Sequence, residues 1–400
     1  MAINIHDPDQ PEQRQTFALF NLGFRPFFLL AGIFAVVTMI GWALIYSGTL
    51  SFDTGKLTLF QWHAHEMIFG YAMAVIAGFL LTSVQTWTGQ PMPGGSRLGL
   101  IVLFWVCARV AFVLGGDALL VGALFNLCFM VLFAIAISSK IFKVRQWRHN
   151  GILAAIGLMA LAQLVVVIGL MQRDQWLIFI ALYSAFYLVV LLILIMARRV
   201  VPFFTERGVG YPLELRQSRL LDVAVHGGFV LYALCALFSQ QEAAAVIAAL
   251  VFIASMVRLA NWYTPGIWKK SLLWSLHLSL LLISAGFLLA ALAPWLGISQ
   301  YLVLHTFALG GIGMITLSMM CRVALGHTGR GVHQPPAMVV LAFLLMALSF
   351  FARVIMPLIA PADYALWVLI SQLAWIVAFV IFVALYAPML FRPRVDGKPG

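Results

Sequence analysis

Apolar runs of about twenty residues follow one another along almost the whole chain, and they constrain its fold more than any other feature. Hydrophobic side chains make up 64% of the 400 residues and charged side chains only 9%, whereas soluble domains carry about a quarter charged residues. A helix of about 20 apolar residues crosses the hydrocarbon core of a bilayer. The sequence therefore predicts an all-α protein, a polytopic bundle of transmembrane helices surrounded by lipid.

Charged residues, Pro and Gly separate these runs into about twelve spans. The predicted spans are 25–48, 62–84, 98–115, 118–138, 151–171, 175–197, 221–239, 243–261, 271–293, 300–322, 336–357 and 364–388. We expect residues 1–24 to form a cytoplasmic N-terminal segment, residues 25–390 a single integral membrane domain, and residues 391–400 a cytoplasmic tail.

The basic residues are distributed unevenly between the two sides of this predicted bundle. Nineteen of the 24 Lys and Arg residues lie in the N-terminus, in the loops after the even-numbered spans or in the tail, and the opposite loops hold only Lys56 and Arg173. The positive-inside rule therefore predicts that both termini are cytoplasmic. The net charge of +11 follows from this dispersed pattern, which has no basic stripe, so nucleic acid is not expected as a partner.

Polar side chains are concentrated at the outer start of span 2, in the segment from Gln61 to Met67. On a regular helix His63, Glu66 and Met67 share one face, and His65 points nearly the other way. One metal ion cannot bind both histidines there, so they serve two centres or His63 lies on irregular backbone. The small residues that continue the His63 face, from Gly70 onwards, leave room for another helix or for a flat macrocycle.

A second histidine, His305, is expected at a similar depth near the outer end of span 10. Arg109 and Arg353 fall in the same half of the membrane, where they can pair with carboxylates or with haem propionates. Polar groups in hydrocarbon are costly without partners, so each is a functional candidate. Imidazole suits haem iron and copper, and the thioether of Met67 adds a preference for Cu(I).

A third group lies toward the predicted cytoplasmic side. His226 follows Asp222 near the inner end of span 7, His277 lies near the inner end of span 9, and Arg258 lies on span 8 at a comparable depth. Histidines at two depths suggest two metal centres, one in each leaflet. The alternative for His226 and His277 is hydrogen bonding between helices.

Two further residues on that side have open roles. Arg25 at the start of span 1 is either an anchor that reaches the interface or a cofactor contact. His327 lies with Arg330 in a predicted loop flanked by glycines. The segment 199–204 is expected to close over the same side.

Four segments together resemble the NnrS family of bacterial inner-membrane proteins. They are Leu22–Phe28, Trp62–Gly70, Pro202–Thr205 and Leu325–Arg330. The resemblance implies about twelve spans in the bacterial inner membrane, haem, expected to be b-type, and copper as cofactors, and nitric oxide as the ligand during denitrification or nitrosative stress.

The chain also resembles, more loosely, the catalytic subunit of haem–copper oxidases and nitric oxide reductases. That subunit has twelve spans and haem-ligating histidines on spans 2 and 10, to which His65 and His305 would correspond. This chain departs from its pattern because span 7 has no adjacent pair of histidines and span 10 has no H-x-H.

The first functional hypothesis is therefore a haem and copper membrane protein that binds nitric oxide and reduces or detoxifies it, with electrons from a donor that the sequence does not identify. In this hypothesis His65 and His305 are axial haem ligands, and His63 and Met67 bind copper. Glu66 orients a ligand, carries a proton or acts as a catalytic group. Arg109, Arg353 and Arg25 contact the cofactor, and His226 and His277 bind a second metal. The alternative is a secondary transporter or proton-coupled permease whose histidines relay protons.

Overall fold

The computed structural model describes residues 17–398, and all regular structure in this part of the chain is helical. Within these described residues, twelve helices are long and apolar enough to cross a membrane, which confirms the predicted class and number of spans. The first six spans are α1 (Phe24–Tyr46), the composite of α2 (Leu59–His65), η1 (Glu66–Ala72) and α3 (Met73–Thr88), α4 (Gly95–Leu114), α5 (Ala118–Lys143), α6 (Asn150–Gln172, preceded by η2, Trp147–His149) and α7 (Gln175–Gly208).

The last six spans begin at Arg219. They are α8 (Arg219–Leu237), α9 (Gln241–Trp262), α10 (Ser271–Leu296, preceded by η3, Pro265–Lys269), the composite of α11 (Gln300–His305), η4 (Thr306–Gly313) and α12 (Met314–His327), the composite of α13 (Met338–Phe350), η5 (Phe351–Ile355) and α14 (Met356–Ile359), and α15 (Tyr364–Phe391, preceded by η6, Pro361–Asp363).

Two segments predicted as connections are helical instead. Helix α7 continues through Pro202 to Gly208, so the segment 199–204 extends span 6 and does not close over the bundle as a loop. His327 is the last residue of α12 and not part of a loop. In both cases the helix continues past the sequence signal that was expected to end it.

Three spans contain a stretch of π-helix, a rare geometry that is found mostly as single turns at functional sites. These stretches are η1 in span 2, η4 in span 10 and η5 in span 11. Each one begins next to a predicted site residue or contains one. His65 and His305 immediately precede η1 and η4, and Arg353 lies inside η5.

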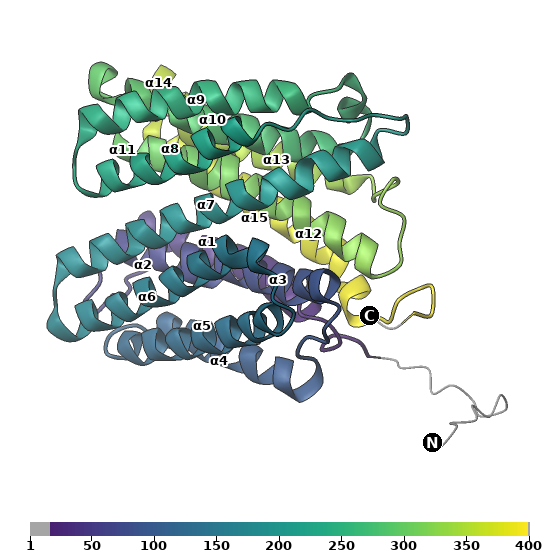
Figure 1. Ribbon diagram of the computed structural model, residues 1–400. Coiled ribbons are helices and arrows are strands. Elements are labelled where there is room, and N and C mark those ends of the chain that lie inside the picture. Colours follow the sequence, from purple (N-terminus) through teal and green to yellow (C-terminus); the bar gives the residue numbers. More distant parts are fainter. Residues whose placement is uncertain (1–16, 399–400) are drawn as a thin grey trace.

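Spans 2 and 10 form the centre of the bundle. In their most apolar windows 83% and 78% of the residues are buried, against at most 56% in the other spans. The hydroxyls of Tyr71 on η1 and Thr316 on α12 lie 2.6 Å apart, which joins the two spans directly. In Figure 1, α7 runs between the group formed by α2, α4, α5 and α6 and the group formed by α8, α9, α10 and α11.

The two ends of the described chain meet on one side of the bundle. The backbone N–H of Ala18 donates to the carbonyl of Phe391 over 2.8 Å, and Phe17 packs against the Phe391 ring. This agrees with an even number of spans. Residues 1–16 of the expected N-terminal segment and residues 399–400 of the expected tail lie outside the described residues.

Candidate functional site

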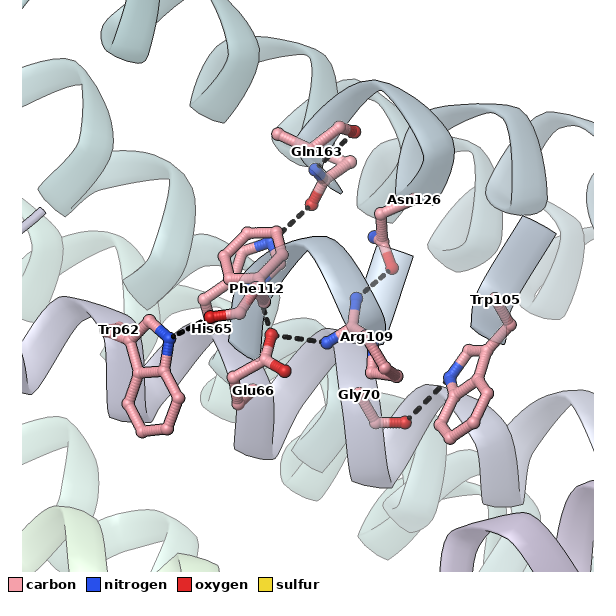
Figure 2. Close-up of polar contacts among 10 residues, drawn as sticks. Trp62, His65, Glu66, Gly70, Trp105, Arg109, Phe112, Asn126 and Gln163 are labelled. Carbon is pink, nitrogen blue, oxygen red and sulfur yellow. Dashed lines mark hydrogen bonds and ion pairs between the residues drawn. The ribbon is translucent and has the colours of Figure 1, made fainter. Parts of the chain in front are cut away.

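Five polar side chains from four spans form a buried network at the start of η1 (Figure 2). Nδ1 of His65 lies 3.0 Å from Oε1 of Glu66, and that oxygen also pairs with the guanidinium of Arg109. Arg109 donates in turn to the Asn126 side-chain oxygen over 2.7 Å, and Nε2 of His65 lies 3.1 Å from Oε1 of Gln163. All five side chains are at most 5% exposed.

The orientation of Gln163 decides where the protons of this network lie. Its Nε2 donates to the backbone carbonyl of Ala123 over 3.0 Å, so its oxygen faces His65 as an acceptor. Both ring nitrogens of His65 therefore face acceptors, whereas a neutral imidazole has one N–H. The geometry requires either an imidazolium or a proton shared between Nδ1 of His65 and Oε1 of Glu66.

His65 has no ring nitrogen left for a metal in this arrangement. Its ring also stacks on Phe112, with 4.1 Å between the ring centroids and an interplanar angle of 7°. Arg109 has the carboxylate partner that the sequence predicted as one of two options, and its guanidinium is turned toward Glu66 and Asn126. These contacts do not place His65 or Arg109 beside His305.

The face of span 2 around Gly70 is filled by protein. A Cβ on Gly70 would lie 2.5 Å from the Phe34 ring and 2.8 Å from Nη1 of Arg109. The indole of Trp105 donates to the Gly70 carbonyl over 3.1 Å, which satisfies a backbone group of the π-helix (Figure 2). The close approach of neighbouring helices, one of the two expectations for this face, is confirmed at Gly70.

His63, His305 and Arg353 form a second group, contributed by spans 2, 10 and 11. Arg353 lies within electrostatic range of both imidazoles, and the two imidazoles lie within range of each other. The rings of Phe60 and Tyr301, one turn before each histidine, are 6.0 Å apart. The structure therefore brings His63, and not His65, to His305.

Contacts with neighbouring residues orient both imidazoles of this group. Nδ1–H of His305 donates to the Tyr301 carbonyl over 2.7 Å, which leaves Nε2 with a free lone pair. His63 stacks on Trp42 at a centroid distance of 4.3 Å and an angle of 15°. Nη1 of Arg353 is buried and makes no hydrogen bond to another described residue. Met67 is half-buried on the helix turn after His63.

The third predicted group is divided into two sites. Asp222 pairs with Arg198 at 2.6 Å and lies 3.9 Å from Arg258, and His226 lies within electrostatic range of all three. Nε2 of His226 is buried without a hydrogen bond to another described residue. The neighbours of His226 are thus an ion pair, and His277 is not one of them.

His277 has its own partner on span 6. Its Nε2 lies 2.9 Å from the hydroxyl of Thr205, and that hydroxyl donates to the Val201 carbonyl, so Nε2 of His277 carries the proton. Its Nδ1 is buried with no hydrogen-bond partner among residues 17–398. The structure therefore does not bring His226 and His277, the residues predicted for a second metal centre, together at one site.

Arg25 is fully buried and binds the end of α15. Its Nη1 donates to the carbonyls of Leu390 and Arg392 over 2.9 and 2.7 Å. A cation at this position stabilises the unpaired carbonyls of a helix C-terminus. In this structure Arg25 thus holds the start of α1 against the end of α15.

Sequence reasoning missed Gln163, Asn126 and Trp42. Gln163 and Asn126 are single amides within otherwise apolar spans, a signal that the cost of burying an unpaired amide makes usable. Trp42 gives no such signal, because its aromatic side chain is ordinary in a membrane helix. Within residues 17–398 no group of three or more His, Cys, Asp and Glu side chains is arranged to hold a metal ion.

One known protein family matches nearly the whole chain. The NnrS protein family matches residues 18–394, which includes all twelve spans and all the groups described above. A search of curated proteins finds no match. The matched region contains both polar groups of span 2 and their partners. Because the match covers nearly the whole chain, the chain belongs to the NnrS family of multi-pass membrane proteins.

Proposed function

We propose that this protein is a haem- and copper-containing protein of the nitric oxide response, and that His63 and His305 bind the metal at which nitric oxide is held. Membership of the NnrS family supports the nitric oxide role. The observation that carries the site is the meeting of His63, His305 and Arg353 beside three π-helical stretches. We further propose the bacterial inner membrane as the location, with both termini in the cytoplasm.

The donor chemistry of this group fits a metal. Metal-bound histidines usually donate their second ring N–H to a carbonyl or carboxylate, as His305 does to Tyr301. Imidazole nitrogens would suit haem iron or a Cu(I) ion, and Met67 on the next turn would add a soft donor. The unpaired Nη1 of Arg353 supplies a cation for a propionate. A ferrous haem or Cu(I) centre supplies direct coordination of the gas.

The buried network around Glu66 has a separate task in this proposal. Its geometry keeps a proton at Nδ1 of His65 or Oε1 of Glu66. Oε2 of Glu66 is buried and makes no hydrogen bond within the described chain, so it can accept a further proton. His65 and Glu66 thus hold and move a proton next to the metal-binding histidine, and His65 is not a metal ligand.

The experiment is an optical spectrum with iron and copper analysis of the purified, detergent-solubilised protein. A Soret band that shifts on addition of nitric oxide is expected for the wild type. His63→Ala and His305→Ala should each lose most of the metal at their site, whereas His65→Gln should keep it. His333→Gln, which changes an exposed loop histidine, is the control.

Two outcomes contradict the proposal in different ways. Full metal content in His305→Ala would refute the assignment of the ligand. A wild-type protein without iron or copper, made by cells supplied with both, would refute the cofactors and favour the transporter hypothesis. Consumption of nitric oxide by the reduced protein, followed with an electrode, separates turnover from binding.

A further inference from the structure

A small apolar cavity lies between five helices, in the half of the bundle nearer the two described chain ends. It has a volume of about 80 Å³, and its walls come from α1, α3, α7, α10 and α12. Each of these helices contributes at least one apolar side chain, among them Phe28, Leu80, Leu192, Leu276 and Ile315. No polar atom of a described residue faces the space.

Hydrogen bonds between hydroxyls close the cavity on two sides. Thr316 is a wall residue, but its hydroxyl donates to the Ile312 carbonyl and lies 2.6 Å from the hydroxyl of Tyr71. This contact joins span 2 to span 10 and occupies the polar atom of Thr316. The hydroxyls of Ser275 and Ser318 lie 2.7 Å apart and join α10 to α12. These polar neighbours of the cavity are therefore paired with one another.

Two further contacts close the cavity toward the nearer end of the bundle. The guanidinium of Arg322 lies 3.8 Å from the centre of the Phe204 ring, and both residues are about one helix turn past the cavity walls on α12 and α7. Nε2 of His277 lies 2.9 Å from the hydroxyl of Thr205, which joins α10 to α7. Helix α7 is thus attached to both α10 and α12 just beyond the space.

The half-buried wall residues indicate the open side. They are Phe79 on α3, Ile193, Met196 and Val200 on α7, and Met319 on α12. The wall residues of α1 and α10 are fully buried. The cavity is therefore reached from the side of α3 and α7, past apolar side chains.

The size and the chemistry of the cavity restrict what it can bind. A buried water needs only about 10–15 Å³, but it also needs two to four polar partners, so an apolar cavity stays dry. An apolar cavity of roughly 150 Å³ takes benzene or xenon, and this one has about half that volume. A neutral diatomic molecule has no hydrogen bonds to lose and gains contacts with the walls. The matching class of ligand is a small apolar gas.

We propose that this cavity is a binding site for a small apolar gas and that nitric oxide is its occupant. Spans 2 and 10 supply part of its walls and also carry His63 and His305. Val75 is twelve residues after His63 and Thr316 eleven after His305, so the cavity lies about 16–18 Å along these spans from the two histidines. The choice of nitric oxide rests on the proposed function, whereas the binding of an apolar gas does not.

The test uses xenon, a neutral atom that apolar cavities bind. Crystals of the full-length detergent-solubilised protein are pressurised with xenon, which is located by its anomalous scattering. The wild type should show xenon in contact with Phe28 and Leu276. Ala197→Leu adds bulk to a buried wall position and should lose this peak. The matched control, Ala154→Leu, changes an exposed position of α6 and should keep the peak.

Several results would overturn the proposal. One is a wild-type cavity that holds no xenon, or that holds ordered water or a lipid or detergent chain instead. If Ala197→Leu does not fold, Val200→Phe at a half-buried wall position replaces it, and a peak that survives the filling variant also contradicts the site. Nitric oxide added to the pressurised crystals should lower the xenon occupancy, and an unchanged occupancy would refute nitric oxide as the occupant. Xenon binding does not depend on metal content, so a failure of the proposed metal site would be seen separately.

Discussion

His63 and His65 are two residues apart in sequence and have different chemical surroundings. His65 faces acceptors at both ring nitrogens and stacks on Phe112. His63 makes no hydrogen bond to another described residue and lies near His305 and Arg353. The surroundings of His65 require a proton on the ring. The surroundings of His63 fit a metal ion. Their separation on the helix allows one span to contribute to both groups.

Glu66 and Arg109 give the sharpest prediction at the residue scale. Removing one partner of a buried ion pair costs about 3–5 kcal/mol, because the other charge stays buried and unpaired. Glu66→Gln should therefore lower the free energy of unfolding by about that much. Arg109→Gln should cost less, since the Glu66 carboxylate keeps its bond to His65.

The double variant Glu66→Gln/Arg109→Gln should recover part of the loss, because no unpaired arginine remains. The measurement is unfolding in mixed micelles titrated with SDS, with His333→Gln as the neutral surface control. If the double variant loses the sum of the two single effects, the two side chains are not coupled and the ion pair has no energetic role.

At the scale of elements, the π-helical stretches of spans 2, 10 and 11 combine an irregular backbone with dense packing. Gly310 in η4 touches α10, where a Cβ would lie 2.6 Å from the Cβ of Leu282. Gly311 and Gly313 meet Ile283 and Trp375 in the same way. The glycines therefore allow η4 to approach its neighbours closely, and this contact sets the position of His305 at its start.

Gly310→Ala should destabilise the protein by about 1–3 kcal/mol, the usual cost of overpacking. It should also lower metal retention, because η4 must move and His305 moves with it. Gly41→Ala is the matched control, since it is also a helical glycine in a span but a Cβ there meets nothing within 4 Å. The melting temperature and the metal content of both variants provide the check. Unchanged values in Gly310→Ala would show that the packing of η4 does not position the histidine.

At the scale of the whole molecule, the structure has both described ends on one side, and the distribution of charge predicts which side that is. Nineteen basic residues lie in the N-terminus, in the loops after the even-numbered spans or in the tail. They predict a cytoplasmic location for both ends. Arg25 lies at the same end of the bundle, where it binds the end of α15.

Cysteine labelling tests this orientation. Ser51→Cys lies in the exposed loop after span 1 and Gln217→Cys in the exposed loop after span 6. In intact cells a membrane-impermeant maleimide should label Ser51→Cys and should label Gln217→Cys only after permeabilisation. The parent protein, with its four native cysteines, gives the background. The reverse pattern would place both termini outside and contradict the charge rule.

The sequence predicted the spans well because hydropathy over about 20 residues depends on composition alone. It also placed His63 and His305 at a similar depth, since depth follows from distance to the end of a span. It paired His65 with His305, whereas the structure brings His63 to His305 and Gln163 to His65, because which helix lies against each face of span 2 depends on long-range packing. It likewise expected His226 and His277 to share a site, although His226 lies near the ion pair of Asp222 and Arg198, and His277 contacts Thr205.

The sequence by itself determined that the chain is an all-helical membrane protein of twelve spans, because apolar length and the need to satisfy every backbone hydrogen bond in lipid leave no other choice. Only the tertiary structure decided that His63 and His305 meet, and that His65 contacts Glu66 and Gln163. These pairings join spans far apart in the chain, and local periodicity contains no information about which distant helix is the neighbour.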